Sequence, residues 1–314
     1  MNDIPLTTRL APSPTGEIHA GTIFAALQSW LLAKSTGGEV VLRIEDLDRE
    51  RSKPEFADQI MREYEALGIT WDRGPYYQKD RTDAYEVAFE KLVESDLVYP
   101  CFCTRADLRS MSAPHLGEET VYDGRCASLN ESEVLYRKSS LELDGRNPSM
   151  RVKLPDTSVA FTDMYQGICE YSLRRDCGDF IVRRSDGGYA YQLAVVVDDH
   201  AQGINCVSRG YDLLASTPKQ MFLYEVFGWE MPYYAHFPLF CASDGRRLSK
   251  RDEDATLEMM IDDHGDPKGV LGHIAYLGGL ADEDAPTTPD KLLSGFSIDS
   301  MKDLYECRRA IYFT

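Results

Sequence analysis

The chain has 314 residues, of which 43% are hydrophobic and 27% are charged, a composition typical of a globular protein with a sizeable core. The formal net charge of −18 argues against broad, nonspecific binding of nucleic acid, so an RNA partner would have to meet a local basic patch. The sequence contains no apolar run of about 18 residues and no secretory signal pattern, so we expect a cytoplasmic protein with no membrane contact and with mostly reduced cysteines.

Residues 1–99 alternate strand and helix patterns. A short strand is predicted over 7–11, and apolar residues at helical spacing predict a helix over 20–34. A buried strand over 40–44 follows, and Ser52 is expected to cap the next helix. A third helical pattern lies around 85–92. This alternation predicts an α/β fold, a doubly wound parallel sheet with helices on both faces.

The rest of the chain departs from this alternation. Residues 100–175 are rich in turns and are expected to form an insertion. The sheet is predicted to resume at 180–183 and at 189–197, where three consecutive valines suit a central parallel strand. A helix is predicted over 218–227, and helical patterns continue from residue 257. We expect residues 1–99 to form the first half of a nucleotide-binding domain and residues 176–256 to form its second half. The insertion between them is expected at 100–175, and a short helical C-terminal part at 257–314.

The segment from Arg9 to Thr22, Arg-Leu-Ala-Pro-Ser-Pro-Thr-Gly-Glu-Ile-His-Ala-Gly-Thr, joins the first predicted strand to the first helix. A helix N-terminus attracts phosphate through its unpaired N–H groups and its positive dipole end. Gly21 removes a side chain where a nucleotide could lie against the backbone, and His19 can donate a hydrogen bond to a phosphate oxygen. The alternative is a capped helix start with an incidental histidine.

A second segment, Arg247-Leu-Ser-Lys-Arg251, lies more than 200 residues downstream. Lys250 carries a compact charge on a flexible arm, which suits the β and γ phosphates of ATP, and Ser249 can add a hydrogen bond. A mobile loop could bring both residues to the nucleotide only after it binds. Alone, this segment could be a basic surface loop, but together the two segments indicate an ATP site.

Three charged residues stand near the ends of predicted strands, where ligands bind in such sheets. Arg9 ends the first strand, Glu45 ends the second, and Arg209 follows a strand pattern at 204–208. Either arginine can hold a carboxylate in a two-pronged contact, and Glu45 can hold an ammonium group. Two arginines and one carboxylate suit an amino acid with an acidic side chain, to which Tyr191 could add a hydrogen bond. Alternatively, each charge belongs to a structural ion pair and Tyr191 only packs.

A group of cysteines indicates a metal site. Cys101 and Cys103 stand in Cys-Phe-Cys, and Cys126 ends Tyr-Asp-Gly-Arg-Cys. Three thiolates supply three corners of a tetrahedral structural zinc site. The fourth ligand could be Tyr122 or His115, and simple reduced cysteines are the alternative.

In combination, these motifs resemble the catalytic core of glutamyl-tRNA synthetases, class I aminoacyl-tRNA synthetases, over roughly residues 7–280. The resemblance rests on residues 9–21, Leu42-Arg-Ile-Glu-Asp46, Trp71, Val195-Val-Val-Asp-Asp-His200, Ser208-Arg-Gly210 and Leu248-Ser-Lys250. Two details are similar to the truncated glutamyl-Q tRNA(Asp) synthetase branch. One is the pair Cys101-Phe-Cys-Thr-Arg105 and Tyr122-Asp-Gly-Arg-Cys126, which looks like its zinc-binding insertion. The other is the short stretch after the Leu-Ser-Lys segment, which is expected to leave no room for an anticodon-binding domain.

The resemblance implies a ligase that activates L-glutamate with ATP and magnesium to glutamyl-adenylate. It then implies transfer of the glutamyl group to queuosine at the wobble position of tRNA(Asp). A monomer is expected. The alternatives are a short glutamyl-tRNA synthetase that charges the tRNA 3′ end, a catalytically silent paralogue that binds tRNA, and a small-molecule nucleotidyltransferase on the same fold.

The resemblance also implies roles for individual residues. The residues implied to bind glutamate are Arg9, Ala11, Ser13, Glu45, Tyr191 and Arg209. The residues implied to handle ATP are Pro12, His19, Gly21, Thr22, Ser249 and Lys250, with His19, Gly21, Thr22 and Lys250 serving catalysis. The implied zinc ligands are Cys101, Cys103, Tyr122 and Cys126. The sequence departs from the His-Ile-Gly-His motif of the family at Thr22, which replaces the second histidine with a smaller group.

Overall fold

Parallel strands from both halves of the chain form the centre of the protein. The computed structural model describes residues 4–104, 106–107, 121–242 and 256–313. Strand β1 (Thr8–Leu10) pairs with β2 (Val40–Ile44), which pairs with β3 (Arg73–Tyr77). In the second half, β9 (Cys206–Gly210) pairs with β10 (Tyr233–Phe237). The predicted strands over 7–11 and 40–44 are therefore confirmed.

The two groups of parallel strands meet at β1 and β9. The backbone amides of Asn205 and Cys206 both donate to the Thr7 carbonyl at 3.2 Å. The spatial order is therefore β3-β2-β1-β9-β10, in which the chain order changes direction between β1 and β9. The predicted doubly wound α/β fold is therefore confirmed. In such folds, ligands bind where the strand order changes direction, beyond the carboxyl ends of the strands.

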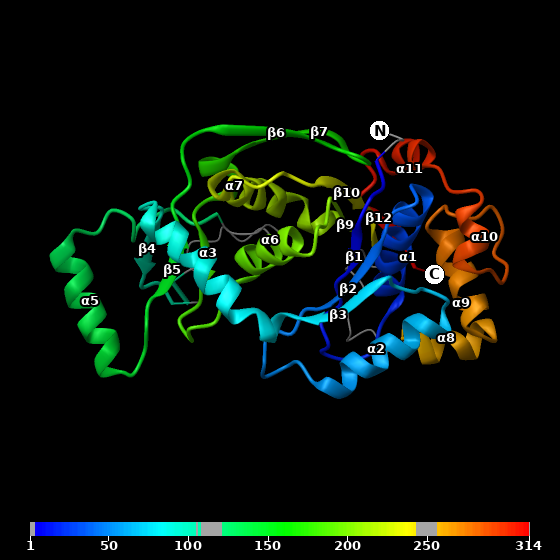
Figure 1. The fold of residues 1–314 in the computed structure, drawn as a ribbon, viewed down its shortest axis with the longest axis horizontal. Coiled ribbons are helices and arrows are strands. Elements are labelled where there is room, and N and C mark those ends of the chain that lie inside the picture. The colour runs from blue at the N-terminus through cyan, green and yellow to red at the C-terminus, as the bar shows by residue number, and fades with distance from the viewer. Residues whose placement is uncertain (1–3, 105, 108–120, 243–255, 314) are drawn as a thin grey trace.

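Helices cover both faces of these strands (Figure 1). The larger hydrophobic cluster surrounds α1 (Ala20–Ser35) and includes side chains of α2 (Pro54–Ala66). A second cluster joins α3 (Thr82–Glu94), α6 (Tyr191–Ala201) and α7 (Thr217–Phe227). The predicted helices over 20–34 and 218–227 are confirmed as α1 and α7. Shorter helical turns lie at Gln78–Arg81, Leu173–Cys177 and Tyr211–Ser216.

The interpretation of residues 189–197 as a parallel strand is wrong, because this segment forms most of helix α6. Leu193 to Val197 are all buried among α3, α7 and the strands that they cover. A continuous apolar run is compatible with a buried strand or with a buried helix, and tertiary packing decides between them here.

Smaller corrections concern a cap and two strands. Helix α2 has Lys53 at its N-cap instead of Ser52, whose hydroxyl finds no hydrogen-bond partner among the described residues. The strand at 180–183 exists as β8 (Phe180–Arg183), but it is antiparallel to β5 (Ser149–Val152) and so does not extend the parallel sheet. Arg209 lies inside strand β9 and does not follow it.

A small antiparallel sheet lies at one end of the molecule, with order β4-β5-β8, where β4 is Val98–Cys101. Helix α5 (Glu131–Leu143) lies beyond it, at the left of Figure 1. A hairpin of β6 (Ser158–Asp163) and β7 (Gly167–Ser172) returns towards the centre. Its Asp163 pairs with Tyr234 of β10 in a parallel bridge, so the hairpin meets the outer parallel strand.

The C-terminal part is helical from residue 257, as predicted, and ends in a strand that the sequence did not predict. Its helices are α8 (Leu257–His264), α9 (Pro267–Leu277), α10 (Pro289–Leu293) and α11 (Ile298–Tyr305). Strand β12 (Ala310–Tyr312) then pairs in parallel with β11 (Leu239–Cys241). Within the described ranges, no helix is long and apolar enough to cross a membrane.

The Tyr305 hydroxyl fixes α11 to the core. It accepts a hydrogen bond from Gln28 Nε2 of α1 and donates one to the Gly278 carbonyl, both at 2.7 Å, and Tyr305 is fully buried. Replacing Tyr305 with Phe should lower the free energy of unfolding by about 1–3 kcal/mol, because two buried polar groups lose their partner. Denaturant unfolding measures this loss. Tyr312→Phe, at a side chain that is 56% exposed, is the matched control; an equal loss in both variants would contradict the role assigned to the buried hydroxyl.

Candidate active site and cysteine cluster

A cavity of about 440 Å³ opens where β1 and β9 meet, at the carboxyl ends of the parallel strands. Its walls come from the β1–α1 segment, from the end of β9 and from residues 237–240. Glu45, directly after β2, and Tyr191, the first residue of α6, complete the wall. This is the position where a doubly wound sheet binds ligands.

The cavity brings together every described residue that the sequence assigned to the glutamate and ATP sites. These residues are Arg9, Ala11, Pro12, Ser13, His19, Gly21, Thr22, Glu45, Tyr191 and Arg209. The two remaining residues, Ser249 and Lys250, lie outside the described residues. Segments more than 180 positions apart in the sequence therefore share one cavity.

The N-terminus of α1 opens onto the cavity. His19 occupies the N-cap position, and its carbonyl accepts from the amides of Thr22 and Ile23. The first turn carries no acidic side chain, so no charge within that turn opposes an anion near the positive end of the helix. A Cβ on Gly21 would lie 3.2 Å from the His19 ring, so a side chain there would press on the imidazole.

A largely buried ion-pair network holds Arg9, Arg43 and Glu45 in place. Arg43 is fully buried, and it donates to Asp199 at 2.6 Å, to Gln202 at 3.0 Å and to Glu45 at 3.2 Å. Arg9 donates to the same Asp199 oxygen at 3.3 Å and to the Ser208 carbonyl at 2.9 Å. Asp199 thus lies between two guanidinium groups, which share its single negative charge.

The network sets the protonation of its members. Burial alone would lower the pKa of Arg43, but the neighbouring carboxylates of Asp199 and Glu45 raise it, so the guanidinium stays charged. Burial raises the pKa of Glu45, against the opposing effects of Arg43 and Arg9. A cationic group entering the cavity beside Glu45 would favour the ionised carboxylate, so this position suits an ammonium group.

Arg209 is held on three sides. Its Nε donates to His236 at 2.9 Å, and its two terminal nitrogens donate to Gln220 and Thr217, each at 2.8 Å. The side chain is nearly buried, yet Arg209 is part of the cavity wall. Burial raises the pKa of the nearby Tyr191 hydroxyl, which therefore stays protonated and can donate a hydrogen bond into the cavity.

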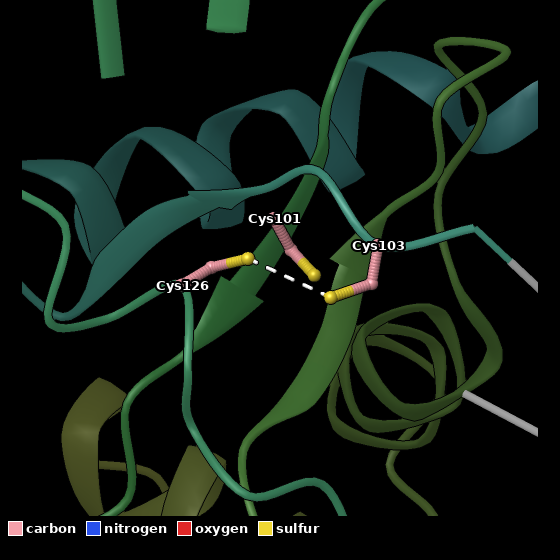
Figure 2. Close-up of side chains that lie close together, drawn as sticks. All are labelled: Cys101, Cys103 and Cys126. Carbon is pink, nitrogen blue, oxygen red and sulfur yellow. Dashed lines mark hydrogen bonds between the residues drawn. The ribbon is translucent and has the colours of Figure 1, made fainter. Parts of the chain in front are cut away.

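The predicted metal ligands meet in a separate cluster. The Sγ atoms of Cys101, Cys103 and Cys126 all lie within 4.8 Å of one another and point towards a common centre (Figure 2). The Tyr122 hydroxyl lies 3.5 Å from Cys101 Sγ and 3.6 Å from Cys103 Sγ. His115, the other candidate for the fourth ligand, lies outside the described residues. The cluster could therefore hold a metal ion.

The surroundings favour a thiolate in this cluster. A hydrogen bond from Cys126 lowers the pKa of Cys101, and the same bond raises the pKa of Cys126. The Arg151 guanidinium lies 3.8 Å from the centre of the Tyr122 ring, and a positive charge there partly offsets the negative charge of thiolates.

Several residues that hold the cavity residues in place were not predicted from the sequence. Arg43 lies two residues before Glu45 in the Arg-Ile-Glu-Asp motif, but nothing in that motif shows that its guanidinium group is buried. Asp199 stands in the quoted Val-Val-Val-Asp-Asp-His motif, but the strand predicted over 189–197 ends before it, so nothing in the sequence places its carboxylate beside Arg43 and Arg9. His236 and Asp163 carry no local pattern at all, since they meet across 73 positions of sequence.

The Arg43 network predicts a large effect on stability. Arg43→Met should lower the free energy of unfolding by about 3–5 kcal/mol, because buried Asp199 and half-buried Glu45 lose their shared cation. Arg51→Met is the control, since the pair of Arg51 with Asp48 is exposed and should contribute less than about 1 kcal/mol. Chemical denaturation of both variants measures the difference. A loss at Arg43 no larger than that at Arg51 would contradict the network's role.

Comparisons with known proteins agree with this architecture. Residues 5–288 match the family described as tRNA synthetases class I (E and Q), catalytic domain. A solved structure of a glutamate tRNA ligase from Elizabethkingia meningosepticum, in complex with its amino acid, superposes with a TM-score of 0.79 at 28% identity. That superposition covers 99% of this chain and 67% of the other.

Curated relatives fall into two groups. The glutamyl-Q tRNA(Asp) synthetase of Symbiobacterium thermophilum is 42% identical over 304 residues, 93% of each chain. That of Nitratidesulfovibrio vulgaris is 41% identical, over 90% of this chain and 89% of its own. The glutamate–tRNA ligase of Coprothermobacter proteolyticus is 40% identical, and the match covers 89% of this chain but only 60% of that longer protein. The resemblance expected from the motifs is therefore confirmed: the chain belongs to the class I tRNA synthetases of the glutamate and glutamine (E and Q) family, and is a ligase-type, aminoacyl-tRNA synthetase-like enzyme.

Proposed function

We propose that this enzyme activates L-glutamate with ATP and transfers the glutamyl group to queuosine at the wobble position of tRNA(Asp). Relatives that carry the name glutamyl-Q tRNA(Asp) synthetase match at 41–43% identity and support this choice of amino acid and acceptor. The amino acid has a second, independent support in the cavity, whereas the acceptor rests on those names.

The observation that carries the choice of glutamate is the convergence of Arg9, Arg209 and Glu45 on one cavity. Glutamate has two carboxylates and one ammonium, so two cations and one anion complement it in number and sign. Guanidinium groups suit carboxylates because their N–H groups form a planar fork. Glutamine would place a neutral amide opposite one arginine and would lose the charge-assisted contact that a carboxylate makes there, which disfavours that ligand.

ATP is proposed to lie along the N-terminus of α1. His19, Gly21 and Thr22 would face its phosphates there, with Pro12 beside them. Ser249 and Lys250 remain proposals from the sequence, supported by chain connectivity: the backbone of Thr256, six residues after Lys250, bridges to His19. Magnesium bound to ATP would neutralise phosphate charge when present.

The proposed chemistry needs no protein nucleophile. An oxygen of the substrate carboxylate attacks the α-phosphorus of ATP, the bond to the bridging α–β oxygen breaks, and pyrophosphate leaves. In the second step the acceptor displaces AMP from the glutamyl carbonyl. The protein's contribution is to orient both substrates and to stabilise the negative charge that moves onto the leaving group.

We propose that the cysteine cluster holds one structural zinc ion, with Cys101, Cys103, Cys126 and Tyr122 as ligands. The separation of 3.7 Å between Cys103 Sγ and Cys126 Sγ suits the proposal, because two thiolates on a tetrahedral zinc lie about 3.8 Å apart at the usual Zn–S length. The ion would join β4 to the loop at Tyr122 and Cys126, and would thereby stabilise this end of the protein.

Cys103→Ser should reduce bound zinc well below one ion per chain and lower the melting temperature. Glutamate-dependent exchange of pyrophosphate into ATP should stay within a few-fold of the wild type, because the cluster supplies no group to the cavity. Metal analysis and a thermal melt measure the first two effects. Cys307→Ser, at an exposed thiol outside the cluster, is the matched control. Wild-type protein purified without chelators that contains no zinc would contradict the proposal.

The proposed setting is the cytoplasm, where all eight cysteines, which carry free thiols, would stay reduced. A monomer is proposed, and its mass in solution tests this. A second function, charging of the tRNA 3′ end, is favoured by one observation: the glutamate–tRNA ligase of Coprothermobacter proteolyticus is almost as similar in sequence as the first group of relatives.

One labelling experiment separates the two acceptors. Purified enzyme, ATP and labelled glutamate are incubated with tRNA(Asp) that either carries or lacks queuosine. In a portion of each, the 3′-terminal adenosine is removed enzymatically, a treatment that leaves queuosine intact. We expect label only in queuosine-containing tRNA, whether or not the terminal adenosine is present. Label that requires the terminal adenosine would replace the proposed acceptor with the 3′ end.

A further inference from the structure

Behind Arg209, three side chains form a line of buried hydrogen bonds that leads away from the cavity. Arg209 Nε lies 2.9 Å from His236 Nε2, and His236 Nδ1 lies 2.6 Å from Asp163 Oδ2. His236 and Asp163 are both fully buried, and His236 is not part of the cavity wall. The line joins β9, β10 and the end of β6, so three strands determine where Arg209 stands.

Donor and acceptor rules leave one arrangement for this line. A guanidinium group has N–H donors and no acceptor, so His236 Nε2 must accept and carries no proton. The ring proton of the neutral histidine is then on Nδ1 and is donated to Asp163. Burial lowers the pKa of His236, against the effect of Asp163, and the charges of Arg209 and Arg9 act in the same direction as burial. The neutral ring is therefore the form that the site maintains.

Asp163 is itself held in place. Its Oδ1 accepts from the backbone amides of Tyr165 and Gln166 at 3.0 Å and from that of His236 at 3.1 Å. Its other oxygen, Oδ2, is left for the His236 ring. The carboxylate therefore cannot turn without breaking the turn between β6 and β7.

Counting the N–H donors of Arg209 shows how many of them remain for a ligand. Arg209 has five N–H groups, and three of them are directed to His236, Gln220 and Thr217. Two N–H groups are left, and the cavity is the open side of this side chain. Gln220 is fixed in turn, because its amide donates to Gln192 at 2.9 Å.

We propose that His236, held by Asp163 in the Nδ1–H tautomer, is a positioning residue that aims the two remaining N–H groups of Arg209 at a substrate carboxylate. This inference rests on the proposed binding of glutamate by Arg209. His236 does not touch the substrate. It acts by fixing in advance a long side chain whose ordering would otherwise cost binding free energy.

Two substitutions of His236 test its hydrogen bonds to Asp163 and to Arg209 separately. In His236→Asn, the side-chain N–H₂ group can replace Nδ1–H towards Asp163, but no acceptor reaches Arg209. In His236→Gln, the side-chain oxygen can replace Nε2 as the acceptor for Arg209, but Asp163 loses its ring donor. The matched controls are His273→Asn and His273→Gln, since His273 forms another His–Asp pair, with Asp284 at 2.9 Å, outside the cavity wall.

Pyrophosphate exchange gives the apparent KM for glutamate and for ATP in each variant. We expect His236→Asn to raise the KM for glutamate about tenfold to a hundredfold, because a buried hydrogen bond to a charged group is lost. The KM for ATP and kcat should stay within about twofold, and His236→Gln should recover most of the glutamate affinity. The order of thermal stability should be the opposite, with the Gln variant the less stable, because Oδ2 of its buried Asp163 loses the ring donor.

Equal effects of Asn and Gln on the KM for glutamate would overturn the proposal, as would a rise in the KM for ATP that matches the rise for glutamate. The tautomer provides a test that needs no activity. Long-range ¹H–¹⁵N correlation spectra, assigned with His236→Asn, should show protonated Nδ1 and unprotonated Nε2. A proton on His236 Nε2 would also overturn the proposal. A wild-type enzyme that shows the expected tautomer but no glutamate-dependent exchange would instead overturn the proposed function.

Discussion

The buried contact of Arg43 with Asp199 is the interaction on which the rest of the site depends. Neither side chain has access to water that could solvate its charge, so each is stable only while the other is in place. Arg43 belongs to β2 in the first half of the chain, and Asp199 belongs to α6 in the second. The same carboxylate also contacts Arg9 of β1. The requirement that these buried charges stay paired thus fixes how the two halves meet, and the cavity forms where they do.

The sequence predicted those parts of the fold in which local pattern and tertiary environment agree. The helix α1 and the strand β2 carry regular apolar spacing and lie in the core that this spacing requires. The described cavity residues could be named because they stand in motifs of contiguous sequence, and the strand order brings those motifs together. Helix α6 was missed because Val195 to Val197 are buried on all sides, and such a run has no period that distinguishes helix from strand.

The parts that escaped prediction depend on distant partners. His236 and Asp163 are polar residues inside strands, and only their contact across β6 and β10 gives them a role. Gly74 and Gly38 are similar cases. An added Cβ would lie 2.3 Å from the Leu42 carbonyl oxygen at Gly74 and 2.1 Å from that of Leu6 at Gly38, and no local pattern in the sequence shows either close approach. Local sequence constrains the shape of a segment, whereas these roles arise from what another segment places beside it.

The pairing of β11 with β12 has a consequence for the order in which the protein can fold during synthesis. β11 lines the cavity through Leu239 and Phe240, and its partner strand is some 70 residues further along the chain. Phe240 also packs edge-to-face with Phe313, and Leu239 donates its amide to the Arg309 carbonyl. A nascent chain can therefore assemble β1, β2 and α1 early, but this wall of the cavity stays incomplete until residues 309–313 emerge from the ribosome. Until then the exposed edge of β11 and the apolar face of Phe240 are surfaces that a chaperone could bind.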